Sequence, residues 1–348
     1  MTDHPLNYRS LPGLWQEYAE TERSLAFKAK NLAEAQDWQI QLREKLIALL
    51  GGFPAQACDL APQLVEAREE DGFTCQELAI QTRPGEFMPC QVLVPHQVTG
   101  DRLKPVIALH GHGTWGGAAI VKNPDDPLGA ALNQQLNYAY AGQLAKRGYL
   151  VFVPELRGFG KRLEGEGFQE GDAQWTSSCY AIGVNALLLG KTLLGLRVYD
   201  VMRLIDYIRT RPEPLSETLG CVGLSGGGMV TLFTTALDPR ITCAVVSGYF
   251  NTFRDSIMAV RHCLCNFVPG LVTVAEMVDL AGLVAPRPLL IETGTRDPIF
   301  PTTATQRAYA ELQKIYAVWG VKHLELDIFE GEHAWSGAKA YDWLAQWL

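Results

Sequence analysis

The stretch Gly220–Val230, GCVGLSGGGMV, places a single serine among glycines, between two apolar segments. A dinucleotide-binding loop would need a third, correctly spaced glycine and an acidic residue ending the next strand, but the next apolar run ends near Ser247 without a carboxylate. A Walker phosphate loop would need a lysine, which this stretch lacks. The spacing of Gly223, Ser225 and Gly227 instead predicts a sharp strand-to-helix turn that presents the serine as a nucleophile.

A serine becomes a good nucleophile only beside a general base and an acid that orients the base. The base is predicted to be His333, because it directly follows the last apolar run of the chain, in FEGEHAWSG. The acid is predicted to be Asp297, in the loop after RPLLIETG, whereas its rival Glu292 still lies at the end of that run. The order Ser225, Asp297, His333 is the chain order of the α/β-hydrolase triad.

Short apolar runs alternate with amphipathic helical patterns on both sides of the predicted turn. Eight runs predict strands, at residues 77–82, 90–95, 105–111, 149–155, 220–224, 241–248, 287–294 and 323–331. Valine-, isoleucine- and leucine-rich runs between helices are typical of a parallel sheet that is covered on both faces. We therefore predict an α/β-hydrolase fold with a mostly parallel eight-stranded sheet and with helices on both faces.

The N-terminal part of the chain has a different pattern. Residues 12–50 are predicted to be helical, because apolar residues recur there at steps of three and four, at Leu32, Ala35, Trp38, Leu42, Leu46 and Leu49. Gly51 and Gly52 then end the pattern. We predict a helical extension over residues 1–60 and a catalytic domain over residues 61–348. The apolar stripe of the extension could cover this chain or a neighbouring copy, so a homo-oligomer is left open.

Acyl transfer through a serine also needs hydrogen-bond donors for the negatively charged oxygen of the tetrahedral intermediate. The backbone N–H groups of Gly226 and His112 are the predicted donors, because Gly226 follows the serine and His112 lies in the glycine-rich loop HGHGTWGG. We expect lid-like loops around residues 158–190 and 251–284. Three aromatic residues that follow strand ends are candidate pocket walls, namely Trp115, Tyr249 and Phe250.

Metal and nucleic-acid functions find little support in the sequence. His110 and His112 form an H-x-H pair, but the further histidine and the acidic residue of a binuclear zinc site are missing. Cys263 and Cys265 are spaced too closely for the usual zinc knuckle. The net charge of −8 and the absence of a basic block argue against a nucleic-acid partner. We therefore expect no metal and no nucleic acid.

The remaining composition indicates a globular protein of the cytoplasm. The first residues lack the basic and apolar regions of a secretory signal, and the longest apolar stretch is interrupted by Asn185 and Lys191, so no membrane span is expected. The eight cysteines are scattered through 348 residues, and several lie inside apolar runs, as reduced core thiols do.

Five motifs together resemble the dienelactone hydrolase-like and acetyl xylan esterase-like group of α/β-hydrolases. They are LHGHG, YLVFVPELRGFG, GLSGGG, APRPLLIETGTRDPIFP and GEHAW, and the resemblance covers roughly residues 75–348. It implies a triad of Ser225, Asp297 and His333 and no metal or organic cofactor. Dienelactone hydrolases generally carry a cysteine nucleophile, so the serine here favours ordinary carboxylic esters.

The sequence thus predicts a serine carboxylesterase acting on small esters, with short acyl or acetyl groups. The same machinery could cleave peptides, as in relatives of the oligopeptidases, although no propeller-like repeats precede the core. A hydrolase fold used only for binding is the other alternative, and the complete triad argues against it.

Overall fold

The computed structural model describes residues 8–98 and 100–348. The helices are α1 (Leu11–Glu20), α2 (Leu32–Leu49), α3 (Gly116–Val121), α4 (Pro127–Leu136), α5 (Tyr140–Lys146), α6 (Cys179–Leu188), α7 (Leu193–Thr210), α8 (Gly226–Leu237), α9 (Met277–Gly282), α10 (Thr302–Val318) and α11 (Ala340–Trp347). Short 3-10 turns are η1 (Gly160–Arg162), η2 (Glu166–Phe168), η3 (Leu264–Asn266) and η4 (Leu271–Thr273).

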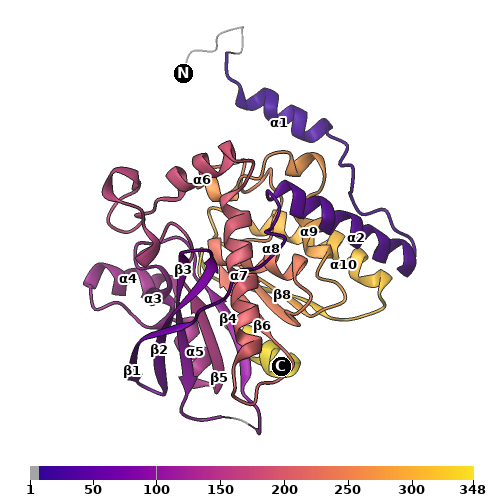
Figure 1. Cartoon of the computed structure of the whole chain (residues 1–348). Helices are drawn as coiled ribbons and strands as arrows, with labels where there is room; N and C mark the ends of the chain where they lie inside the picture. The colour runs from indigo at the N-terminus through magenta and orange to yellow at the C-terminus, as the bar shows by residue number, and fades with distance from the viewer. Residues whose placement is uncertain (1–7, 99) are drawn as a thin grey trace.

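The strands form one twisted sheet, which Figure 1 shows behind helix α7. They are β1 (Gln63–Glu70), β2 (Phe73–Arg83), β3 (Glu86–Pro95), β4 (Lys104–Leu109), β5 (Tyr149–Pro154), β6 (Gly220–Leu224), β7 (Cys243–Ser247), β8 (Leu289–Gly294) and β9 (Leu324–Phe329). Their order in the sheet is β1-β2-β3-β5-β4-β6-β7-β8-β9. The pairs from β5 to β9 are parallel, whereas β1, β2 and β3 are added antiparallel.

The sheet has nine strands among the described residues, so the prediction of eight was wrong by one. The missed strand is β1, which pairs only with β2 at the edge of the sheet. Its sequence, QLVEAREE, is mostly exposed on both faces, and Leu64 and Val65 are more than half exposed. An edge strand that buries neither face carries no apolar alternation, so periodicity could not reveal it.

Helices cover both faces of the sheet, as predicted. On β4, Ile107 and Leu109 join one hydrophobic cluster, whereas Val106 and Ala108 join the other. Because successive side chains of a strand point to opposite faces, these two clusters lie on the two sides of the sheet. The first cluster includes side chains of α2, α7, α8, α9 and α10, and the second includes those of α3, α5 and α11.

The N-terminal extension contains two helices, α1 and α2, and residues 21–31 between them are not helical, so the prediction of helix over 12–50 was only partly right. Helix α2 belongs to the main core of the molecule. Trp38, Leu42 and Leu46 are buried in the first hydrophobic cluster, so the extension covers the core of its own chain. Helix α1 has no buried residue and stands apart from the body in Figure 1. Its end is tied to the body where the Tyr18 hydroxyl donates to the Glu276 carboxylate.

The longest apolar stretch is folded as two helices, α6 and α7. Within the described part of the chain, no single helix is both long and apolar enough to cross a membrane, and this pair reaches the required length only across a bend of 98°.

Candidate active site

Ser225 lies between the end of β6 and the start of α8, in a strained backbone conformation. Its φ of 58° and ψ of −119° are rarely adopted by residues other than glycine. The turn leaves no room for side chains beside it, because a Cβ on Gly227 would lie 1.8 Å from the carbonyl oxygen of Leu109. A Cβ on Gly223 would lie 2.4 Å from the carbonyl carbon of Gly227. The structure thus has the sharp turn that the glycine spacing predicts.

His333 and Asp297 lie in the loops that follow β9 and β8, and the fold brings them into contact. The Nδ1 atom of His333 is 2.7 Å from Oδ2 of Asp297. The other carboxylate oxygen, Oδ1, accepts hydrogen bonds from the backbone N–H groups of Ile299 and Phe300, at 2.8 and 2.9 Å. These bonds hold the aspartate rigidly, and the ring of Phe300 stacks on the imidazole. Nε2 of His333 makes no hydrogen bond to any described residue.

Glu292, the rival acid, has a different role. Its side chain is buried and accepts hydrogen bonds from the backbone N–H groups of Ser336 and Gly337, at 3.4 and 3.1 Å. Burial raises the pKa of this carboxyl to about 7. It therefore fastens the loop that follows His333, and it makes no hydrogen bond to the imidazole among the described residues.

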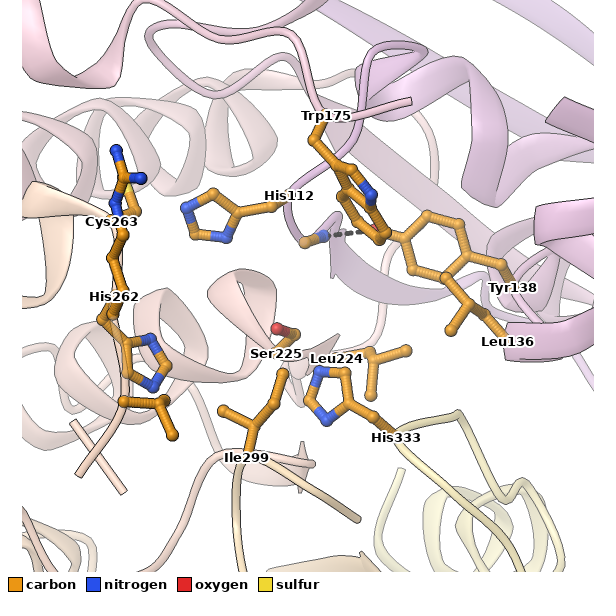
Figure 2. A pocket seen from close by; sticks show the side chains of 13 residues that line it. His112, Leu136, Tyr138, Trp175, Leu224, Ser225, His262, Cys263, Ile299 and His333 are labelled. Carbon is orange, nitrogen blue, oxygen red and sulfur yellow. Dashed lines mark hydrogen bonds between the residues drawn. The ribbon is translucent and has the colours of Figure 1, made fainter. Parts of the chain in front are cut away.

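Ser225 and His333 both line a cavity of about 430 Å³, which Figure 2 shows. One wall carries Leu136, Tyr138 and Trp175, and the opposite wall carries Val260, Arg261, His262 and Cys263. In Figure 2 the serine lies between the rings of His112 and His333, with Ile299 and Leu224 beside them. The cavity lining is mostly apolar, and its charged or titratable side chains include Arg261 and His262 as well as His112 and His333.

Two backbone N–H groups, those predicted as oxyanion donors, make no hydrogen bond to a described residue. The N–H of Gly111 donates to the hydroxyl of Tyr138, the bond drawn as a dashed line in Figure 2. By contrast, the N–H groups of His112 and Gly226 have no acceptor among the described residues. Burial raises the pKa of Tyr138 well above its usual range, so the phenol stays neutral. The two N–H groups predicted as oxyanion donors therefore have no acceptor among the described residues and are free to donate a hydrogen bond.

The three aromatic residues predicted as pocket walls do not line this cavity, and that prediction was wrong. Tyr249 and Phe250 are 1 % and 2 % exposed and belong to the main core, because the chain turns inward after β7. Gly248, which precedes them, lies beside the His333 imidazole instead: a Cβ there would lie 3.0 Å from Cε1 of His333. Trp115 precedes α3, and its ring packs against Gly129 of α4.

The lid-like loops predicted from the sequence supply much of the cavity wall. Trp175 belongs to the loop between β5 and α6, and Val260–Cys263 belong to the segment between β7 and α9. His262 also lines the cavity, and burial lowers its pKa to about 4. Nothing in the spacing of these residues distinguishes them from other loop residues, so sequence reasoning could not select them.

Arg157, which follows β5, forms a buried ion pair. Its guanidinium binds the buried carboxylate of Asp200 through Nε and Nη2, at 2.8 and 2.9 Å. Arg162 contacts the same carboxylate at 2.7 Å. This network supports the start of the loop over residues 158–190, away from the residues that line the cavity.

The two histidines of the H-x-H pair do not share a site. His110 is fully buried; its Nδ1 lies 2.8 Å from the carbonyl oxygen of Gly111, and its Nε2 accepts from the N–H of Leu156. The imidazole of His112 faces Cys265 instead, with Nε2 3.3 Å from Sγ. His112 and three cysteines form the one group of potential metal ligands found among residues 8–98 and 100–348.

Comparison with known proteins places this geometry in a family. The model of the Abhydrolase family matches residues 10–314, which include Ser225 and Asp297 but end before His333. The chain is also 26% identical over 290 residues to "Putative hydrolase YtaP" of Bacillus subtilis (strain 168), covering 80% of this chain and 88% of that protein.

Two solved structures share the fold at low sequence identity. A putative acetyl xylan esterase from Bacteroides fragilis NCTC 9343 superposes with a TM-score of 0.75 at 16% identity, over 97% of this chain and 90% of its own. A glucuronoyl esterase from Solibacter usitatus superposes with a TM-score of 0.65 at 13% identity, over 94% of this chain and 98% of its own. At these identities the likeness concerns the fold.

Proposed function

The chain belongs to the Abhydrolase family, and we propose that it is a serine carboxylesterase that hydrolyses small carboxylic esters with short acyl groups. One observation carries the proposal. The imidazole of His333 is fixed by Asp297 at Nδ1 and leaves Nε2 without a partner among the described residues, in the same cavity as the strained Ser225. The acetyl xylan esterase and glucuronoyl esterase with this fold also act on esters, as their names say.

The mechanism follows from these positions. Nε2 of His333 takes the proton of the Ser225 hydroxyl while Oγ attacks the ester carbonyl carbon. The N–H groups of His112 and Gly226 stabilise the oxyanion of the tetrahedral intermediate. The imidazolium, stabilised by Asp297, then gives its proton to the leaving alcohol, and an acyl-enzyme remains. Water attacks this acyl-enzyme by the same route and releases the acid.

The cavity supports a small and largely apolar substrate. Its volume of about 430 Å³ lies at the lower end of the range for ligand sites. Leu136, Trp175 and Ile299 present apolar surface around the serine, so short alkyl or acetyl groups gain contacts there while a charged acyl group would lose hydration. We expect acetyl and butyryl esters to be better substrates than long-chain esters.

Peptide cleavage remains the alternative activity. In the described residues, two helices precede the sheet: the second is buried in the core, whereas the first contributes only the partly buried Tyr18. Neither helix encloses the cavity mouth in a way that would sort peptides by size, and neither lines the cavity. A non-catalytic binding role is disfavoured by the strained serine, because such strain persists where it serves a function.

The test is hydrolysis of nitrophenyl esters of increasing acyl length by the wild type and by Ser225→Ala. We expect the variant to lose at least about a thousandfold in kcat/KM, as removal of a triad serine does elsewhere. Ser216→Ala is the matched control, because Ser216 lies before β6 and bonds only to Thr218 and neighbouring backbone. Wild-type rates in Ser225→Ala would overturn the proposal.

A fluorogenic dipeptide amide measured beside the esters separates the esterase from the peptidase. A fluorophosphonate probe separates both from a binding protein, since only an activated serine is labelled. Cleavage of the amide at a rate comparable with the ester would favour the peptidase. An unlabelled wild-type protein would favour the binding role.

A further inference from the structure

Four side chains from separate parts of the chain meet at the edge of the cavity. His112 follows β4, Cys179 begins α6, and Cys263 and Cys265 flank the start of η3. Their ligand atoms, one imidazole nitrogen and three sulfurs, all lie within 4.8 Å of one another. Cys179 and Cys265 are buried, and His112 and Cys263 are half-buried, so the group is largely closed to solvent. We call it the Cys3His cluster.

The spacing of the Cys3His cluster suits a tetrahedral metal site. Zinc binds sulfur at about 2.3 Å and nitrogen at about 2.0 Å, which places ligand atoms roughly 3.6 Å apart around the ion. Nε2 of His112 and Sγ of Cys265 are already 3.3 Å apart. Three thiolates and one imidazole are also a ligand set that zinc prefers in closed structural sites.

The charge around the cluster supports the same conclusion. The side chain of Arg197 is completely buried, and its Nη2 lies 3.0 Å from Sγ of Cys179. Its Nε donates to the carbonyl oxygen of Arg157 at 3.1 Å, and no carboxylate of the described residues forms an ion pair with it. A buried cation without a counter-charge is costly. Three thiolates and an imidazole around a divalent ion carry one net negative charge, which Arg197 would balance.

Further hydrogen bonds surround the ligand atoms, as they do in metal centres. The side-chain amide of Asn266, itself 6 % exposed, donates to Sγ of Cys265 at 3.7 Å. Phe159 packs edge-on against the His112 imidazole, with ring centroids 5.2 Å apart, and holds its orientation. These contacts fix ligand side chains that would otherwise be free to rotate.

We propose that His112, Cys179, Cys263 and Cys265 bind one zinc ion in a closed, structural site. The ion joins the loop after β4 to both lid-like segments, because Cys179 belongs to the segment 158–190 and the other two cysteines belong to the segment 251–284. All four coordination positions are filled by the protein, so this ion activates no water. Binding displaces the thiol protons to solvent, since the ligands are thiolates.

The proposed zinc ion would also affect ester hydrolysis, an inference that rests on the proposed function. His112 would hold the metal through its imidazole and the oxyanion through its backbone N–H. A fixed imidazole therefore fixes the direction of that N–H. Loss of the ion should lower kcat by about tenfold or more with a smaller change in KM, because the donor acts mainly in the transition state.

The experiment measures metal in the full-length protein, purified without chelators from cells supplied with zinc. We expect about one zinc ion per chain by elemental analysis, as for other sites with four protein ligands. Cys179→Ser and Cys265→Ser should each retain less than about a tenth of that amount. Cys58→Ser is the matched control and should retain it, because Cys58 lies outside the cluster and its sulfur makes only a weak contact with the carbonyl oxygen of Gln81.

Two further measurements test for the metal site in proteins that fold, in case a cysteine variant does not. Cobalt substituted into the wild type should give thiolate-to-cobalt absorption, and Ser225→Ala should show the same absorption although it hydrolyses no ester. Thiol titration in denaturant with a chelator should find all eight cysteines reduced. A wild type that neither contains nor takes up zinc or cobalt would overturn the proposal, and so would a disulfide within the cluster or iron as the bound metal.

Discussion

Asp297 and His333 stand 36 residues apart in the chain, yet Oδ2 of the aspartate lies 2.7 Å from Nδ1 of the histidine. The other oxygen of Asp297 is held by two backbone N–H groups, so the carboxylate has one orientation. The histidine therefore keeps its proton on Nδ1 and presents Nε2 as an acceptor to the cavity. Four predictions follow from this arrangement and from the contacts around it.

The first prediction concerns Asp297→Asn. An amide at this position can donate to Nδ1, which moves the imidazole proton to Nε2 and leaves Ser225 without a base. We expect kcat to fall by about 10³–10⁴-fold with little change in melting temperature, as for other triads with the wrong tautomer. Steady-state kinetics on a nitrophenyl ester measure this. Asp71→Asn, at an exposed position paired with Lys146, is the control, and an unchanged kcat in Asp297→Asn would contradict the assignment.

The second prediction tests the crowded turn. In Gly227→Ala the new Cβ would lie 1.8 Å from the carbonyl oxygen of Leu109, which is backbone and cannot rotate away. We expect a loss of about 3 kcal/mol or more in the free energy of unfolding, together with loss of ester hydrolysis. Denaturant unfolding measures the change. Gly13→Ala in α1, where no atom lies within 4 Å, should leave stability and activity close to wild type; equal stability of the two variants would refute the clash.

The third prediction concerns the hydroxyl of Tyr138. Tyr138→Phe removes the acceptor of the Gly111 N–H and so loosens the loop that carries the His112 donor. A buried N–H left without an acceptor costs about 1–3 kcal/mol. We therefore expect a lower melting temperature and a reduced kcat, with KM changed less. Tyr180→Phe, at a position 58% exposed, is the control. If Tyr138→Phe had wild-type kcat and stability, the hydroxyl would have no such role.

The fourth prediction is a pH dependence of stability that arises from Glu292. Burial raises the pKa of this group from 4.5 to about 7 in the folded protein. Between these values the folded state holds a proton that the unfolded chain has released, so stability falls as pH rises through this window. The amide in Glu292→Gln stays neutral at every pH, so this variant should lack the part of the decline in stability that Glu292 causes.

The measurement is the melting temperature at about pH 5 and about pH 8. The wild type should lose a few degrees more than Glu292→Gln, which corresponds to about 2 kcal/mol for a domain of this size. Glu311→Gln, whose carboxylate is exposed and paired with Lys314, should follow the wild type. Parallel curves for the wild type and Glu292→Gln would show that Glu292 is not the group responsible.

Much of the reactive end of the site could be predicted from the sequence. The positions of Ser225, Asp297 and His333 depend on a local rule, because residues just after parallel strands meet at one edge of the sheet. The helix Leu32–Leu49 was also predictable from its spacing. The residues of the pocket walls could not be predicted in this way. Tyr249 and Phe250 follow a strand as expected, but the path of the chain turns them into the core.

What the sequence by itself determined, then, is the turn at Ser225, the placement of Ser225, Asp297 and His333 after three different strands, and the alternation of strands and helices. Each of these features depends on the spacing of residues along the chain. That spacing sets the local backbone geometry and decides which face of a helix or strand a residue occupies. Only the tertiary structure decided that Trp175 and His262 line the cavity and that Cys179 lies beside Cys265 and His112. Those contacts depend on how two long loops pack over the sheet, and no local spacing encodes the distance between segments that are far apart in sequence.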